Sequence, residues 1–172
     1  MLWPWNSQRL PDELREFFAH SPVFSYTHDT VGQWTHSRGM FIGGGGIPSA
    51  EVDGVIHELA HLVEIDDGRC HLAQWGLASR EAMGARTRGG IDREVRVAGY
   101  QMVVTRSLLH RDVAWTVFAS IANLPGCEFI PSTRPVRWVR DQAEEFARGI
   151  DYGIFRAEFD RKLRILETRF SG

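Results

Sequence analysis

Residues 57–61 read His-Glu-Leu-Ala-His, and the positions immediately on both sides of them are uncharged or apolar. Side chains four positions apart lie on one face of an α-helix, one turn apart. His57 and His61 would therefore be close enough for both imidazoles to bind one metal ion. A helical period of apolar residues runs from Ser49 to about Ile65, after a glycine-rich stretch. The sequence thus predicts a largely buried helix that carries two metal ligands on one face.

The order of residues in this motif matches one particular metal chemistry. HExxH is the signature of zinc metallopeptidases, in which two neutral imidazoles and a third protein ligand leave one coordination position for water. Zinc lowers the pKa of such a water from 15.7 to about 7, and a carboxylate beside the first histidine can take its proton. We therefore predict Zn²⁺ as the cofactor, His57 and His61 as two ligands, and Glu58 as the catalytic general base.

Glu94 is the preferred third ligand. It follows His61 by 33 positions (94 minus 61) and falls on a second helix, which we expect from Ile91 to about Leu109. That separation allows the second helix to pack against the first and to bring a carboxylate to the metal.

From position 57 to 101 the chain resembles the gluzincin branch of the zincin-like metallopeptidases, where HExxH is followed by a glutamate on a downstream helix. The resemblance implies His57, His61 and Glu94 as the metal ligands. Many thermolysin-like members have an aspartate four residues after that glutamate, and here the position is Ala98. Another group must then orient the ligand histidine, such as Asp66, Asp67 or a backbone carbonyl.

The same stretch looks like that of small HExxH proteins of bacteria and their phages. In these proteins the histidine helix is followed by a segment with Trp-Gly, here Trp75-Gly76, and then by an Arg-Glu-x-Arg-Val helix, here 93–97. This likeness implies no substrate, but it favours Glu94.

Three other acids are alternatives to Glu94. Asp67 falls six residues after His61, where metzincin-like enzymes place their third ligand, but Glu64 stands where those enzymes need a glycine. Glu64 lies one turn past His61 on the same helix face, so it could point at the metal. The favoured interpretation is that it ends the helix in solvent. Asp151 faintly resembles the aspzincin pattern and ranks last.

The coarse pattern of the chain predicts an α+β fold. We expect one zincin-like domain over 1–172, in which a small antiparallel sheet packs on the HExxH helix and a helical C-terminal portion supplies Glu94. The amphipathic stripe of the last helix is assigned to the core. The remaining expected elements are a helix at 11–18, strands at 23–28 and 33–36, and two helices near 136–150 and 152–170. Residues 40–42 either extend the second strand or form another one, and 113–121 is a further element whose type is left open.

Composition limits the setting in which the chain works. A net charge of -2 and a pI near 6.4 argue against a general nucleic-acid binder. We find no apolar stretch long enough for a membrane span and no signal peptide, so we expect a soluble, cytoplasmic protein. Cys70 and Cys127 are too few for a disulfide framework, and Cys70 is assigned as a small buried thiol. Most tryptophans, including Trp34 and Trp115, are assigned to the core, while Trp75 falls in an irregular segment over the site.

These observations predict zinc-dependent hydrolysis of peptide bonds, with a protein or peptide as the substrate. The resemblance implies that an edge strand pairs with an extended peptide, which strands around 35–42 could do through main-chain hydrogen bonds. The oxyanion donor is left open among Tyr100, His71, Tyr152 and Arg93. The alternative is a catalytically weak zinc-containing protein that acts by contact with a partner protein. A metal hydrolase for another bond is a third hypothesis.

Overall fold

The computed structural model describes residues 10–27, 31–44, 48–73, 88–124 and 127–172. By contact the chain divides into two compact units: Met1–Gly76 together with Ala157–Gly172, and Leu77–Arg156. The α+β class is confirmed, because a small sheet is combined with helices. The single domain expected for 1–172 stays a prediction.

The sheet of the first unit has three strands: β1 (Phe24–Thr27), β2 (Val31–His36) and β3 (Gly39–Gly44). Their order is β1-β3-β2, with β2 antiparallel and β1 parallel to β3. The sheet is therefore mixed, and the prediction of an antiparallel sheet is wrong for β1. Alternation of apolar residues identifies a strand and its buried face, but it carries no information on strand direction.

Gly39 allows β1 to approach β3 closely. The Met40 N–H donates to the Val23 carbonyl oxygen over 2.7 Å, which starts the parallel pairing. A Cβ atom on Gly39 would lie 2.4 Å from that oxygen, and the residue has a φ of +155°. Only glycine combines this conformation with the absence of a side chain, so the strand order depends on it.

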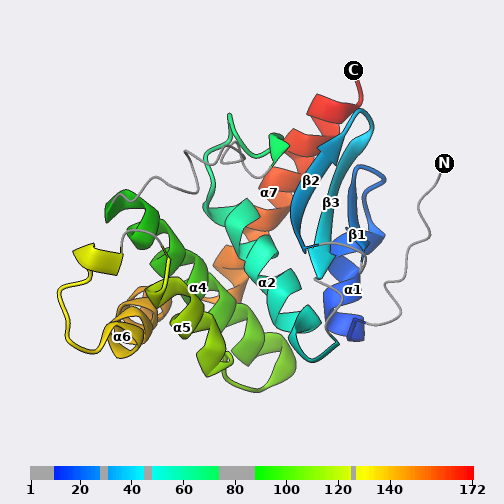
Figure 1. Ribbon diagram of the computed structural model, residues 1–172. Helices are drawn as coiled ribbons and strands as arrows, with labels where there is room; N and C mark the ends of the chain where they lie inside the picture. Colours follow the sequence, from blue (N-terminus) through cyan, green and yellow to red (C-terminus); the bar gives the residue numbers. More distant parts are fainter. Residues whose placement is uncertain (1–9, 28–30, 45–47, 74–87, 125–126) are drawn as a thin grey trace. The chain divides into compact units, whose positions relative to one another are not determined.

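One face of the sheet is buried by helices of the same unit. These are α1 (Asp12–Ala19), α2 (Pro48–Glu64) and the part of α7 (Tyr152–Phe170) from residue 157 onward (Figure 1). Phe159 of α7 packs edge-on against Phe17 of α1 and Phe24 of β1, with ring centroids 4.9 and 5.5 Å apart. The predicted core role of the α7 stripe is confirmed, since Phe155, Phe159 and Leu166 are fully buried.

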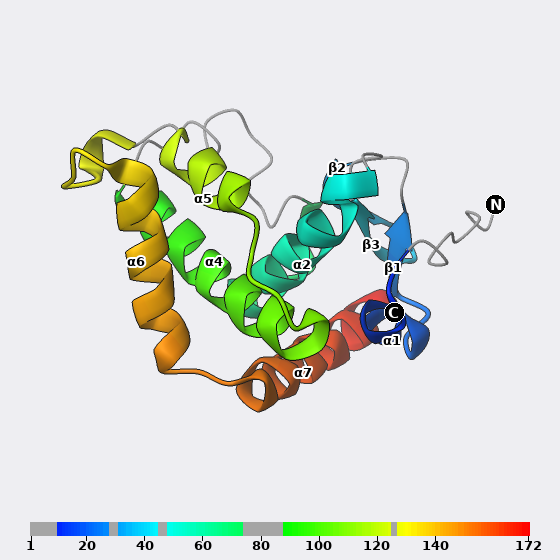
Figure 2. The ribbon, with the colours of Figure 1, turned by 90° about the horizontal axis from the view of Figure 1, so that it is seen from below.

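In the residues that the structure describes, the second unit is helical. It comprises α4 (Arg88–Leu109), α5 (Trp115–Ala122), the short 3₁₀ turn η3 (Cys127–Phe129), α6 (Pro135–Arg148) and the first residues of α7. Helices α4 and α6 run side by side (Figure 2). Small residues on both helices, Ala98 and Ala143, are buried where they meet. Pro135 begins α6, where its missing N–H leaves no hydrogen bond unmade.

The predicted helices agree in position with the structure to within a few residues, and the element left open at 113–121 is the helix α5. Two tryptophan assignments are wrong. Trp34 on β2 is 42% exposed and Trp115 on α5 is 50% exposed. Both lie on amphipathic elements, and composition alone does not reveal which face such a residue occupies. Among the described residues, no helix is both long enough and apolar enough to cross a membrane.

Candidate metal centre

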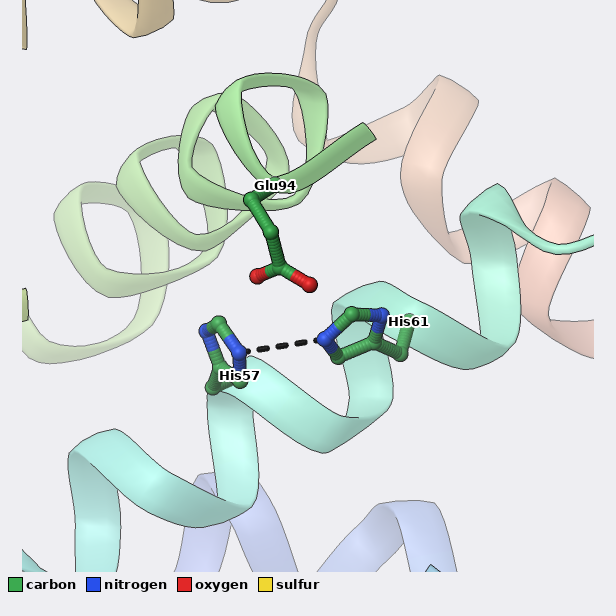
Figure 3. Close-up of side chains that lie close together, drawn as sticks. All are labelled: His57, His61 and Glu94. Carbon is green, nitrogen blue, oxygen red and sulfur yellow. Dashed lines mark hydrogen bonds between the residues drawn. The ribbon is translucent and has the colours of Figure 1, made fainter. Parts of the chain in front are cut away.

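Helix α2 presents two imidazoles to one point. The Nε2 atoms of His57 and His61 lie 3.1 Å apart (Figure 3). The planes of the two rings are nearly perpendicular, and the ring centroids are 4.7 Å apart. Two nitrogens bound to one tetrahedral zinc ion, each at 2.0–2.1 Å, lie about 3.3 Å from each other. The two Nε2 atoms, which a hydrogen bond joins in this structure, are therefore close to the separation that a shared zinc ion would impose.

Apolar neighbours on α2 fix this pair. Val55, Ile56, Leu59, Ala60 and Leu62 are fully buried, so the helix is anchored around most of its circumference. His61 is 8% exposed, and His57 is half-buried. A metal ion between the two rings would thus be largely shielded from bulk water, which strengthens its electrostatic effects.

Glu94 completes a group of three candidate ligands. It lies on α4 and is half-buried. Three possible ligand atoms lie within 4.8 Å of one another, one from each of His57, His61 and Glu94 (Figure 3). Two imidazoles and one carboxylate are a donor set that zinc accepts, and with three protein ligands the fourth position stays open. The structure thus contains a candidate His-His-Glu metal site among the residues that it describes.

Glu58 occupies the next position on α2 after His57 and is half-buried. It does not belong to the group of three candidate ligands. Its role as general base stays a prediction.

The structure places the alternative ligands elsewhere. Both oxygens of Asp67 accept hydrogen bonds from Arg161 over 2.6 Å, and Lys162 lies 3.0 Å away. Asp151 caps α7, because its Oδ1 accepts from the Ile154 N–H over 2.8 Å. Glu64 ends α2 and is half-buried. None of the three acids joins the histidine pair in the candidate group.

Cys70 matches its assignment as a structural thiol. It is fully buried, and its Sγ donates to the Asp67 carbonyl oxygen over 3.1 Å. Burial is the main cause that raises the pKa of this thiol, so it stays protonated at neutral pH.

Packing distinguishes the proposed oxyanion donors only in part. The ring of Tyr100 contacts Phe146 and Phe155, and the ring of Tyr152 stacks on Phe155. Both tyrosines therefore have core contacts in the second unit. His71 is half-buried, and partial burial, followed by the charge of Arg169, lowers its pKa. The Trp75 segment expected over the site lies outside the described residues.

The peptide-binding prediction is wrong for one of its two strands. Met40 and Ile42 belong to β3, which is hydrogen-bonded on both sides and cannot accept another strand. Of these two strands only β2, which contains Thr35, lies at an edge of the sheet. Sequence alone does not reveal which strand is central, because all three are short and strand order depends on pairing between distant residues.

Lys162 was missed by the sequence interpretation. Its side chain is 3% exposed, and its Nζ contacts the Ile65 carbonyl oxygen directly after α2. One signal was available, because Lys162 is the only lysine among the 20 lysine and arginine residues of the chain.

The fold and the site together define an α+β chain with a candidate His-His-Glu metal centre. Comparison of the chain with protein-family models, with curated proteins and with solved structures finds no significant match. The function must therefore be argued from the site itself.

Proposed function

We propose that the chain is a zincin-like zinc peptidase, with His57, His61 and Glu94 as metal ligands and Glu58 as general base. The observation that carries the proposal is the pair of Nε2 atoms 3.1 Å apart within an HExxH helix, with the Glu94 carboxylate in the same candidate group. A metal site with a purely structural role does not need a glutamate directly after its first histidine ligand. The presence of Glu58 at that position therefore favours a hydrolytic role for the metal.

Each residue of the motif has a distinct task in this proposal. A zinc ion at this site would be held by His57, His61 and Glu94 and would supply an activated water, since zinc with three protein ligands lowers the pKa of a water at the open position to about 7. Glu58 would accept a proton from the attacking water and would pass it to the amide nitrogen of the substrate as the C–N bond breaks. His57 and His61 would bind the metal as neutral imidazoles.

Zinc content tests the metal part of the proposal. We expect one zinc per chain in the wild type and in Glu58→Gln, and loss of zinc in Glu94→Ala. Asp92→Asn is the matched control, because it removes an exposed carboxylate two positions away on the same helix. Absence of zinc from the folded wild type, prepared without chelator, would refute the metal site. Zinc retained by Glu94→Ala but lost by Glu64→Gln would reassign the third ligand.

Cleavage tests the catalytic part. The zinc-loaded wild type is incubated with a mixture of internally quenched peptides, and Glu58→Gln serves as the comparison. A positioned general base contributes about 10²–10⁴-fold to rate, so the variant should lose cleavage while it keeps its zinc. If neither zinc-loaded protein cleaves any peptide, peptidase activity is contradicted and the alternative is favoured, a zinc-containing protein that acts by contact with a partner. Equal cleavage by both would contradict the role of Glu58.

A further inference from the structure

The C-terminal end of α2 is held by a buried charge. The Ile65 N–H donates to the His61 carbonyl oxygen over 3.0 Å, which closes the last turn of this helix. The Ile65 carbonyl oxygen in turn accepts a hydrogen bond from Nζ of Lys162. Carbonyls at the end of a helix lack partners within the helix, and a positive charge there also complements the helix dipole. Lys162 therefore caps the turn that carries the second histidine.

The charge of Lys162 is balanced locally. Asp67 Oδ1 lies 3.0 Å from Nζ, and Arg161 binds both oxygens of the same carboxylate over 2.6 Å. Glu158 accepts from Arg161 in turn. Arg161 first, and then Lys162, hold the pKa of Asp67 well below its usual range, so the carboxylate stays ionised. The cluster of two cations and two carboxylates is thus neutral as a whole.

Burial of an ammonium group is a costly way to stabilise a fold. A buried ion pair can often be replaced by apolar side chains of similar volume without loss of stability. The chain uses arginine for all its other basic residues, with lysine only at this position. An ammonium group is compact and can point at one carbonyl oxygen, whereas the planar guanidinium needs more space and several acceptors. The geometry of the lysine ammonium group therefore suits a hydrogen bond to the single carbonyl oxygen of Ile65.

We propose that Lys162 is a positioning residue for the metal centre: by fixing Ile65 it sets the backbone, and hence the imidazole orientation, of His61. This inference rests on the proposed zinc site. The path consists of two consecutive hydrogen bonds, from Nζ to the Ile65 carbonyl and from the Ile65 N–H to the His61 carbonyl. Groups that orient metal ligands typically change metal affinity by 10–100-fold when they are removed.

Zinc affinity, measured by competition with a chromogenic chelator, tests the inference. We expect Lys162→Met to bind zinc about tenfold more weakly than the wild type, a shift at the lower end of that range. The matched control is Arg164→Met, which removes an exposed cation two positions later on α7 and should leave the affinity unchanged. Cobalt in place of zinc gives a second readout, because its visible absorption depends on the coordination geometry. The bands of Lys162→Met should shift, whereas those of Arg164→Met should not.

Urea denaturation of the metal-free proteins separates positioning from stability. Wild-type zinc affinity and wild-type cobalt bands in Lys162→Met would overturn the inference, even if that variant were less stable. Should Lys162→Met fail to fold, Asp67→Asn provides the test. This variant removes the charged partner of Nζ at a half-exposed position, and it should also lower the zinc affinity. An unchanged affinity in Asp67→Asn would then overturn the inference. A wild type that binds no zinc would refute the metal site itself, and with it the positioning role.

Discussion

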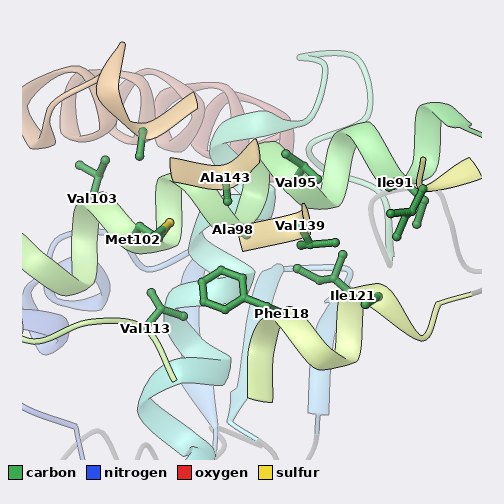
Figure 4. Packing of buried hydrophobic residues seen from close by; sticks show 13 residues of the cluster. Ile91, Val95, Ala98, Met102, Val103, Val113, Phe118, Ile121, Val139 and Ala143 are labelled. Carbon is green, nitrogen blue, oxygen red and sulfur yellow. The ribbon is translucent and has the colours of Figure 1, made fainter. Parts of the chain in front are cut away.

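Replacement of Gly99 by alanine should destabilise the protein, although alanine is the better helix former. Gly99 lies in α4, and a Cβ atom there would lie 2.5 Å from Phe146 Cδ1 and 3.0 Å from the Ala143 carbonyl oxygen on α6. Ordinary contacts between carbon atoms are 3.5–4.0 Å, so a neighbour must move by about 1 Å. Figure 4 shows the adjacent core, in which Ala98 and Ala143 meet.

The net effect follows from two opposing contributions. Overpacking costs about 1–3 kcal/mol, and contacts to both a ring and a backbone oxygen favour the upper half of that range. Higher helix propensity returns about 1 kcal/mol. We therefore expect a loss of about 1–2 kcal/mol, and for a chain of 172 residues each kcal/mol lowers Tm by about 2–4 °C.

Urea and thermal denaturation of Gly99→Ala and Gly149→Ala measure this difference. The second variant makes the same chemical change at the end of α6, where a Cβ atom would lie 3.6 Å from its nearest neighbour, an ordinary contact. It should be neutral or more stable by about 0.4–1 kcal/mol, because alanine restricts the unfolded chain. If Gly99→Ala were as stable as Gly149→Ala, the packing argument for α4 and α6 would be refuted.

Three further predictions concern the first unit and the metal. Added zinc should raise the Tm of the wild type in proportion to the logarithm of its concentration, and His61→Ala should show no such rise; an equal rise in both would place zinc elsewhere. Asp67 has a pKa below its ordinary value of 3.8 in the folded state, so its stabilisation is complete above about pH 4 and is lost as the pH falls further. The difference in urea midpoint between wild type and Asp67→Asn should therefore shrink as the pH falls from about 4 to about 2, and a constant difference would contradict this. Phe159→Ala should cost about 3–5 kcal/mol in urea denaturation, because its fully buried ring packs between Phe17 and Phe24; a loss below 1 kcal/mol would show that this core closes around the gap.

Local patterns in the sequence predicted the helices and the histidine pair well. The spacing of His57 and His61 determines their relative position, because both lie on one regular helix. The bounds of α7 and its buried stripe follow from the same periodicity. These features depend on neighbours within a few residues along the chain, and sequence records such neighbours directly.

Features that depend on distant parts of the chain were not predicted. The parallel pairing of β1 depends on a close approach between Val23 and Gly39, which no period in the sequence signals. The spacing of Asp67 makes it a candidate metal ligand, yet its partner Arg161 lies 94 residues away. No pattern in the sequence indicates the role of Lys162, because an isolated lysine on an amphipathic helix is normally exposed. Long-range pairing decides the role of each of these residues.

The participation of α7 in the first unit has a consequence for synthesis of the chain. Phe159, Lys162 and Leu166 belong with the sheet and α2, yet they follow Gly76 by about 90 residues. At 5–20 residues per second, a ribosome needs about 5–20 seconds to cover that interval. During this time the aromatic side chains of α1 and β1 lack their partner. The histidine helix can therefore reach its final, capped form only after α7 has been synthesised.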